Sequence, residues 1–175
     1  MFYCLLLSPI YFVLRGIYLR KRVFYVWKEL WYYSFFLFTV AIFSQTVIPS
    51  RDFFYTIETY QKVNLVPFQT INNYIRQLDG PIHTIALYNL LGNIVLFIPF
   101  GFFIPSIWGK CNALWKMLLI ALLVPLFIEA TQYFIGRSVD VDDVILNALA
   151  IIIGYILFLI FAVISKMPYY KLEKS

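Results

Sequence analysis

Residues 129–147 read EATQYFIGRSVDVDDVILN, a run of acidic, amide and basic side chains inside an otherwise apolar part of the chain. The segment LLIALLVPLFI comes directly before this run, and ALAIIIGYILFLIFAVI follows directly after it. Polar residues between two long apolar segments occupy the end of one membrane helix, a turn and the start of the next helix. The run therefore predicts a helical hairpin in a membrane, with its polar turn at one membrane surface.

The composition of the chain is that of a membrane protein. Of its 175 residues, 62% are hydrophobic and 13% are charged, whereas a soluble domain has about 25% charged residues. The net charge of +5 indicates how the chain is oriented in the membrane, and no nucleic-acid partner is expected. The two cysteines have no metal-binding spacing, which argues against a zinc site and against a disulfide framework. No metal and no cofactor is expected for the favoured function.

Apolar segments of about 20 residues predict transmembrane helices. We therefore expect an all-α fold, a polytopic transmembrane helical bundle with about five spans. Two prolines and two glycines interrupt the third segment, and membrane helices tolerate such residues where neighbouring helices satisfy the backbone. That span is accordingly expected to be kinked and central. The predicted spans cover residues 2–14, 30–48, 88–108, 113–135 and 144–164.

The chain divides into three parts by its pattern of charge. Residues 1–29 are expected to form an N-terminal span and a basic cytoplasmic connection, with the long side chain of Arg15 reaching the membrane surface. Residues 30–165 are expected to form the main membrane domain, which includes the long polar connection 49–87. Residues 166–175 are expected to form a basic cytoplasmic tail.

The charges of the connections predict the orientation of the spans. The connections alternate between basic segments, at 15–29, 109–116 and 166–175, and neutral or acidic segments, at 49–87 and 136–143. Basic connections stay on the cytoplasmic side of a membrane. The N-terminus is therefore predicted to lie outside and the C-terminus in the cytoplasm, which places the polar turn at 136–143 on the outer face.

Polar side chains on three of the predicted spans are spaced so that they share helix faces, three or four residues apart. Asp140 is expected to cap the last helix, with Asp143 in the capping-box position, and Arg137 is expected to pair with Glu129. These side chains predict one ligand-binding pocket near the outer membrane surface. Its residues are Asn89, Asn93, Glu129, Gln132, Arg137, Asp140, Asp143 and Asn147.

Several short motifs occur in a fixed order along the chain. They are NLVPF at 64–68, NLLGN at 89–93 with LFIPFG at 96–101, Glu129 with Gln132, GRS at 136–138, DVDDVILN at 140–147 and GY at 154–155. On these motifs, residues 35–165 resemble the VanZ-like family of small bacterial membrane proteins. The resemblance implies a multi-pass protein of the bacterial cell membrane. It also implies a link to low-level resistance to teicoplanin, a glycopeptide antibiotic with an acyl chain, but it brings no established reaction.

Three functions fit this pattern. A binding module would take an amphiphile, such as a lipoglycopeptide or a lipid-linked wall precursor, with Arg137 holding a phosphate or carboxylate. A metal-dependent enzyme would hold Mg²⁺ or Ca²⁺, hard cations that take oxygen ligands, on Glu129, Asp140, Asp142 and Asp143. A structural protein would use the same polar side chains to join helices. In each case the lipid bilayer is the expected partner. Asp142 is expected to be a solvated turn residue outside the pocket.

Overall fold

The structure of the chain, a computed structural model, describes residues 2–20, 25–46, 63–81 and 83–165. These residues are almost entirely helical, which confirms the all-α prediction. They belong to two compact units, which divide between residues 49 and 50. Four predicted features lie wholly or partly outside the described residues. These are the basic residues 21–22, the end of the second span at 47–48, the connection as far as residue 62, and the tail at 166–175.

The first unit is a helical hairpin of α1 (Phe2–Leu19) and α2 (Val26–Thr46). Arg15 donates two hydrogen bonds to the carboxylate of Glu29, from Nε at 2.6 Å and from Nη2 at 2.9 Å. The Arg15 guanidinium also lies 4.0 Å from the centre of the Tyr32 ring. The arginine that is predicted to reach the membrane surface is paired with the next helix, and this ion pair joins the two helices of the hairpin.

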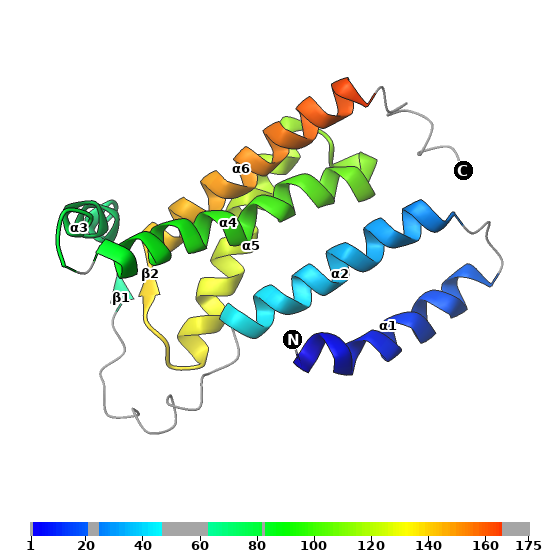
Figure 1. The fold of residues 1–175 in the computed structure, drawn as a ribbon, viewed down its shortest axis with the longest axis horizontal. Coiled ribbons are helices and arrows are strands. Elements are labelled where there is room, and N and C mark those ends of the chain that lie inside the picture. The colour runs from blue at the N-terminus through cyan, green and yellow to red at the C-terminus, as the bar shows by residue number, and fades with distance from the viewer. Residues whose placement is uncertain (1, 21–24, 47–62, 82, 166–175) are drawn as a thin grey trace. The chain divides into compact units, whose positions relative to one another are not determined.

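The second unit contains the bundle of α4 (His83–Ile107), α5 (Leu114–Phe134) and α6 (Val141–Ile164). A short 3₁₀ helix at Gly109–Cys111 joins the first two (Figure 1). Among the described residues, these three helices are long and apolar enough to cross a membrane. They agree with the last three predicted spans, whereas the total of about five spans and the orientation stay predictions.

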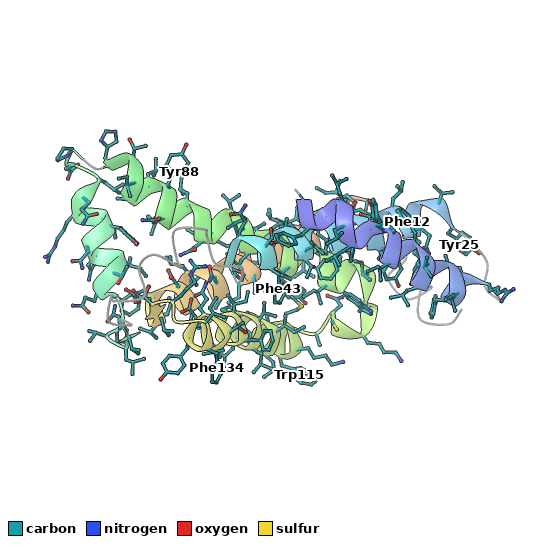
Figure 2. The ribbon with its side chains drawn as sticks, turned by 90° about the horizontal axis from the view of Figure 1, so that it is seen from below. Phe12, Tyr25, Phe43, Tyr88, Trp115 and Phe134 are labelled. Carbon is teal, nitrogen blue, oxygen red and sulfur yellow. The ribbon has the colours of Figure 1, made fainter. Side chains whose placement is uncertain are left out.

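Exposed aromatic residues lie near both ends of α4 and of α5. Tyr88 is 75% exposed near the start of α4, and Trp108 is 44% exposed directly after its end. On α5, Trp115 is 64% exposed and Tyr133 is 49% exposed. Figure 2 labels Tyr88 and Trp115. At 1.5 Å per residue the two pairs are about 30 Å and about 27 Å apart, close to the hydrocarbon thickness of a bilayer. This spacing is that of the aromatic belts of a membrane protein.

The backbones of α4 and α6 meet at two glycines. A Cβ atom on Gly101 would lie 1.9 Å from the carbonyl oxygen of Ile151, and one on Gly154 would lie 1.9 Å from that of Ile98. Only glycine permits so close an approach of two helices. The contact is reciprocal, which agrees with the predicted central position of the helix that carries Gly101.

Helix α5 ends in a turn that positions the segment after it. Gly136 has a φ of 78° and donates its N–H to the carbonyl of Tyr133 at 3.1 Å, while Arg137 donates to the carbonyl of Gln132 at 3.0 Å. These two bonds and the left-handed glycine form a Schellman motif. The chain then enters the short strand β2 (Val139–Asp140), which leads directly into α6.

A segment from much earlier in the chain covers this end of the bundle. Strand β1 (Val63–Asn64) pairs in parallel with β2, with Asn64 opposite Asp140. Helix α3 (Gln69–Gln77) follows and packs on α4 and α6. Figure 1 shows α3 end-on while α4 and α6 run across the view, so α3 crosses the end of the bundle. The fold therefore brings β1 and α3 to the polar turn at 136–143.

Candidate functional site

Asp142 is the most deeply buried carboxylate at this end of the bundle, with a relative exposure of 0%. It accepts three backbone hydrogen bonds from the start of α3: from Phe68 N at 2.5 Å, Thr70 N at 2.7 Å and Ile71 N at 3.0 Å. The first N–H groups of a helix have no partner within the helix, and a negative charge there is also stabilised by the helix dipole. Asp142 thus caps α3 from the neighbouring helix α6.

The backbone at the start of α3, where Asp142 binds, has an unusual conformation. Phe68, at the N-cap position of α3, has a φ of 63° and makes no side-chain capping bond. A left-handed conformation costs a non-glycine residue about 1–2 kcal/mol. The hydrogen bond from Phe68 N to the charged Asp142 carboxylate offsets this cost, so we expect the turn before α3 to depend on the carboxylate.

Asp140 joins three segments through its carboxylate. Its Oδ1 accepts from Asp142 N at 2.9 Å, which confirms the prediction that Asp140 caps the last helix. The same carboxylate accepts from Asn64 Nδ2 at 3.2 Å and from Thr70 Oγ1 at 2.5 Å. The other side-chain atom of Asn64, Oδ1, accepts from Val66 N. The Asn64 side chain therefore connects the NLVPF segment to Asp140.

Glu129 and Asp143 each bind a different element. Glu129 is 4% exposed and its Oε2 accepts from Asp140 N at 3.2 Å. The predicted capping box is therefore wrong, because Glu129 takes the N–H that Asp143 would have bound. Asp143 instead accepts from Asn93 Nδ2 at 2.6 Å, which links α6 to α4. The positive charge of Arg137 acts on both the Glu129 and the Asp143 carboxyl groups.

Two buried amides each lie about one helical turn after a carboxylate of the same helix. Gln132 follows Glu129 by three residues and is 9% exposed, and Asn147 follows Asp143 by four residues and is 3% exposed. Among the described residues, Asn147 Oδ1 has no hydrogen-bond partner. The buried carboxylates and amides at this end of the bundle form one polar cluster. Buried polar atoms are nearly always paired, so Asn147 Oδ1 is the atom of this cluster that needs an additional donor.

Tyr74 of α3 and Asn89 of α4 lie at the edge of the cluster. Burial raises the pKa of the Tyr74 hydroxyl, and the negative charges of Asp143 and Asp140 raise it further, while a hydrogen bond with Asn89 lowers it. Asn89 itself is exposed. It therefore contacts the covering helix at the edge of the buried carboxylates and amides.

Sequence reasoning missed the central residue of the site. The prediction that Asp142 is a solvated turn residue is wrong, because α3 covers the first turn of α6 and removes it from solvent. Asn64 and Thr70 were also outside the predicted pocket. One signal was present: Phe68 precedes a polar helix at the position where a capping side chain is usual. An uncapped helix start requires an acceptor from elsewhere in the chain.

The carboxylates are not arranged as a metal site in the described part of the chain. Asp142 uses both oxygens for backbone N–H groups of α3, and Asp143 accepts from an amide. In residues 63–81 and 83–165, as in the rest of the described chain, no group of three or more His, Cys, Asp or Glu side chains is placed to hold a metal ion. The observed chemistry of the cluster is hydrogen bonding to backbone and amide donors.

Comparison with known proteins supports the resemblance drawn from the motifs. The family model described as VanZ/LLP1 matches residues 30–162, which include α4, α5, all but the last two residues of α6, and the whole of the cluster. No curated protein and no solved structure matches the chain. Because the match covers most of the chain, the protein belongs to the VanZ/LLP1 family.

Proposed function

We propose that this protein acts at the outer face of the bacterial plasma membrane and binds amphiphilic envelope molecules without transforming them. The ligand class is a lipoglycopeptide of the teicoplanin type or a lipid-linked wall precursor. One observation carries the proposal: the buried acceptor Asn147 Oδ1, which has no partner among the described residues, lies near the polar end of an apolar bundle. A polar head with a lipid tail requires this combination of a hydrogen-bonding pocket and adjacent apolar surface.

The charges at the two ends of the bundle support the outer position. The turn at 136–143 is acidic, whereas the opposite end carries Lys110 and Lys116, and the sequence after α6 is also basic. The positive-inside rule assigns the basic end to the cytoplasm. In this orientation a head group from the outer leaflet reaches the polar end without crossing the membrane.

The side chains divide between holding the site together and meeting the ligand. Asp140 and Asp142 bind the protein's own backbone and side chains, so we assign them to positioning. Asn147 Oδ1 would accept a hydrogen bond from a sugar hydroxyl or a peptide N–H. Arg137, which is partly exposed beside the carboxylates, would meet a phosphate or carboxylate of the head group.

A purely structural role is the second candidate. It is favoured by the three aspartates, each of which already accepts hydrogen bonds from within the protein. The metal-dependent enzyme has weaker support, because hydrogen bonds within the protein already use both carboxylate oxygens of Asp140 and of Asp142, two of the four residues that would bind the cation. The structural and the binding roles make opposite predictions for Asn147.

Replacing Asn147 with leucine separates the two roles. Leucine has a similar size, and it removes a buried acceptor that has no partner, so the free energy of unfolding should stay the same or rise. Teicoplanin binding should weaken by about tenfold, which corresponds to the loss of one hydrogen bond of about 1.4 kcal/mol. Both quantities can be measured on the full chain in lipid nanodiscs, by thermal unfolding and by titration.

The matched controls are a second amide and a second ligand. Asn72→Leu changes an exposed amide of α3 and should leave teicoplanin binding unchanged. The teicoplanin aglycone, which lacks the acyl chain, should bind the unaltered protein more weakly. A loss of stability in Asn147→Leu with unchanged binding would support the structural role and contradict the proposed function.

A further inference from the structure

The segment that covers the polar end of the bundle has an apolar stripe of its own. Its apolar residues are spaced by three or four positions, which places them on one side of α3 and the turn before it. The other side of the helix carries amides and its single charged residue. The stripe consists of Phe68, Ile71, Tyr74, Ile75 and Leu78, and the polar side of Gln69, Asn72, Asn73 and Arg76.

The bundle covers only part of this stripe. Ile71 and Tyr74 are partly buried, whereas Phe68 is 55% exposed and Ile75 is 49% exposed. The loop before them adds Leu65, which is 71% exposed. Exposed apolar side chains that lie together on one surface mark a contact with a partner or a membrane. The packing of α3 on α4 and α6 therefore leaves part of the apolar stripe exposed.

The position of α3 identifies what the stripe meets. Figure 1 shows α3 end-on and Figure 2 shows it running across the direction of α4, so in both views it lies over the end of the bundle. Asp142, in the first turn of α6, holds the start of α3 at the level where a candidate span begins. Tyr88, which is exposed at the predicted belt, lies in the second turn of α4, the helix that packs against α3.

We propose that residues 65–78 lie in the membrane interface, with the apolar stripe of α3 in the boundary between head groups and acyl chains. Amphipathic helices take this position with the apolar side buried about 5–10 Å into that boundary. Helix α4, on which α3 packs, also exposes apolar side chains near its start, where Ile85 is 60% exposed and Tyr88 75% exposed. The only charge on α3, Arg76, lies on the polar side, as contact with lipid requires.

This inference goes beyond the proposed function, since it needs no ligand and assigns a role to a segment that was predicted to be a polar connection. It also defines the surroundings of the cluster. The carboxylates would lie beneath a helix that is held by Asp142 on one side and by lipid on the other. An amphiphile diffusing in that leaflet would meet the edge of α3 before it met the cluster.

Spin labels on single cysteines test the position of each side of α3. Cys4 and Cys111 are first replaced with serine, and one cysteine is introduced at Phe68, Ile75, Asn72 or Asn73. The full chain is reconstituted in vesicles of phosphatidylethanolamine and phosphatidylglycerol. Collisions with oxygen report lipid, and collisions with a water-soluble nickel chelate report water. The oxygen-to-nickel ratio should be several-fold higher at 68 and 75 than at 72 and 73.

Two results would overturn the proposal. If position 75 collides with the nickel chelate as often as position 72, the stripe faces water. If both reagents are excluded at 68 and 75, another protein surface covers the stripe instead of lipid. All four residues are exposed, so the labels should not disturb folding, and Leu65→Cys repeats the test outside the helix. Teicoplanin plays no part in this measurement, so the inference can fail while the binding function stands.

Discussion

Asp142→Asn should release α3 from the end of the bundle. The asparagine has no negative charge, and its Nδ2 group would face one or more of the N–H groups of Phe68, Thr70 and Ile71 that the carboxylate now accepts. Hydrogen bonds to charged groups contribute about 1.5–3 kcal/mol each, and an N–H left buried without a partner costs about 1–3 kcal/mol. Any bond to Phe68 N that remains would be to a neutral amide oxygen, so the left-handed turn at Phe68 would lose the charged acceptor that compensates for its cost.

The effect is measured by hydrogen–deuterium exchange of the full chain in nanodiscs. Amides of residues 68–71 should exchange at least about 100-fold faster in Asp142→Asn, which corresponds to about 2.8 kcal/mol. Asp79→Asn makes the same chemical change at an exposed carboxylate just beyond α3 and should leave exchange unchanged. Equal protection of α3 in the unaltered protein and in Asp142→Asn would mean that the carboxylate does not hold the helix.

Gly101→Ala and Gly154→Ala should each strongly destabilise the bundle. The added Cβ would lie 1.9 Å from a carbonyl oxygen of the facing helix, Ile151 O in one case and Ile98 O in the other. The obstacle is backbone, so α4 and α6 would have to separate by more than an ångström along their closest contact. Overpacking of this kind costs about 1–3 kcal/mol, and the loss of dispersion contacts between separated helices adds to that cost.

The loss of stability is measured by keeping the protein in micelles of a mild detergent and unfolding it with increasing amounts of a denaturing detergent. The free energy of unfolding should fall by about 3 kcal/mol or more in either variant. Gly92→Ala is the matched control, because Gly92 lies on the same helix and its added Cβ would meet no atom within 4 Å. That control should be neutral or slightly stabilising, since alanine favours helix over glycine by about 1 kcal/mol. If Gly101→Ala were as stable as Gly92→Ala, the close helix contact would be absent.

The helices of the bundle could be predicted because their signal is local. An apolar run long enough to cross a bilayer is visible without knowing its neighbours, and α4, α5 and α6 begin and end within a few residues of the predicted spans except at the start of α4. The helix cap at Asp140 was predicted for the same reason, since a capping residue adjoins the helix that it caps. The total number of spans depends on α1 and α2, which have weaker apolar signals than the last three.

The uncapped start of α3 indicates that its N–H groups need an acceptor from elsewhere, but no sequence pattern indicates that this acceptor is Asp142. The partners of Asp142 are backbone N–H groups of residues 68, 70 and 71, which lie more than seventy positions earlier in the chain. Every residue except proline has such a group, so no pattern of side chains matches these three to Asp142. The link between Asn93 and Asp143 is different, since both residues belong to the predicted pocket and the structure brings them to 2.6 Å.

The central claim is that the carboxylate cluster and the helix above it lie at the outer surface of the bacterial membrane. It is tested most directly by labelling single cysteines in intact cells with a membrane-impermeant maleimide. Asn72 on the polar side of α3, Ser138 in the polar turn and Lys110 at the opposite end are all exposed. We predict that cysteines at 72 and 138 are labelled in intact cells and that a cysteine at 110 is labelled only after permeabilisation. Labelling at 110 in intact cells, with 72 and 138 protected until permeabilisation, would contradict the account.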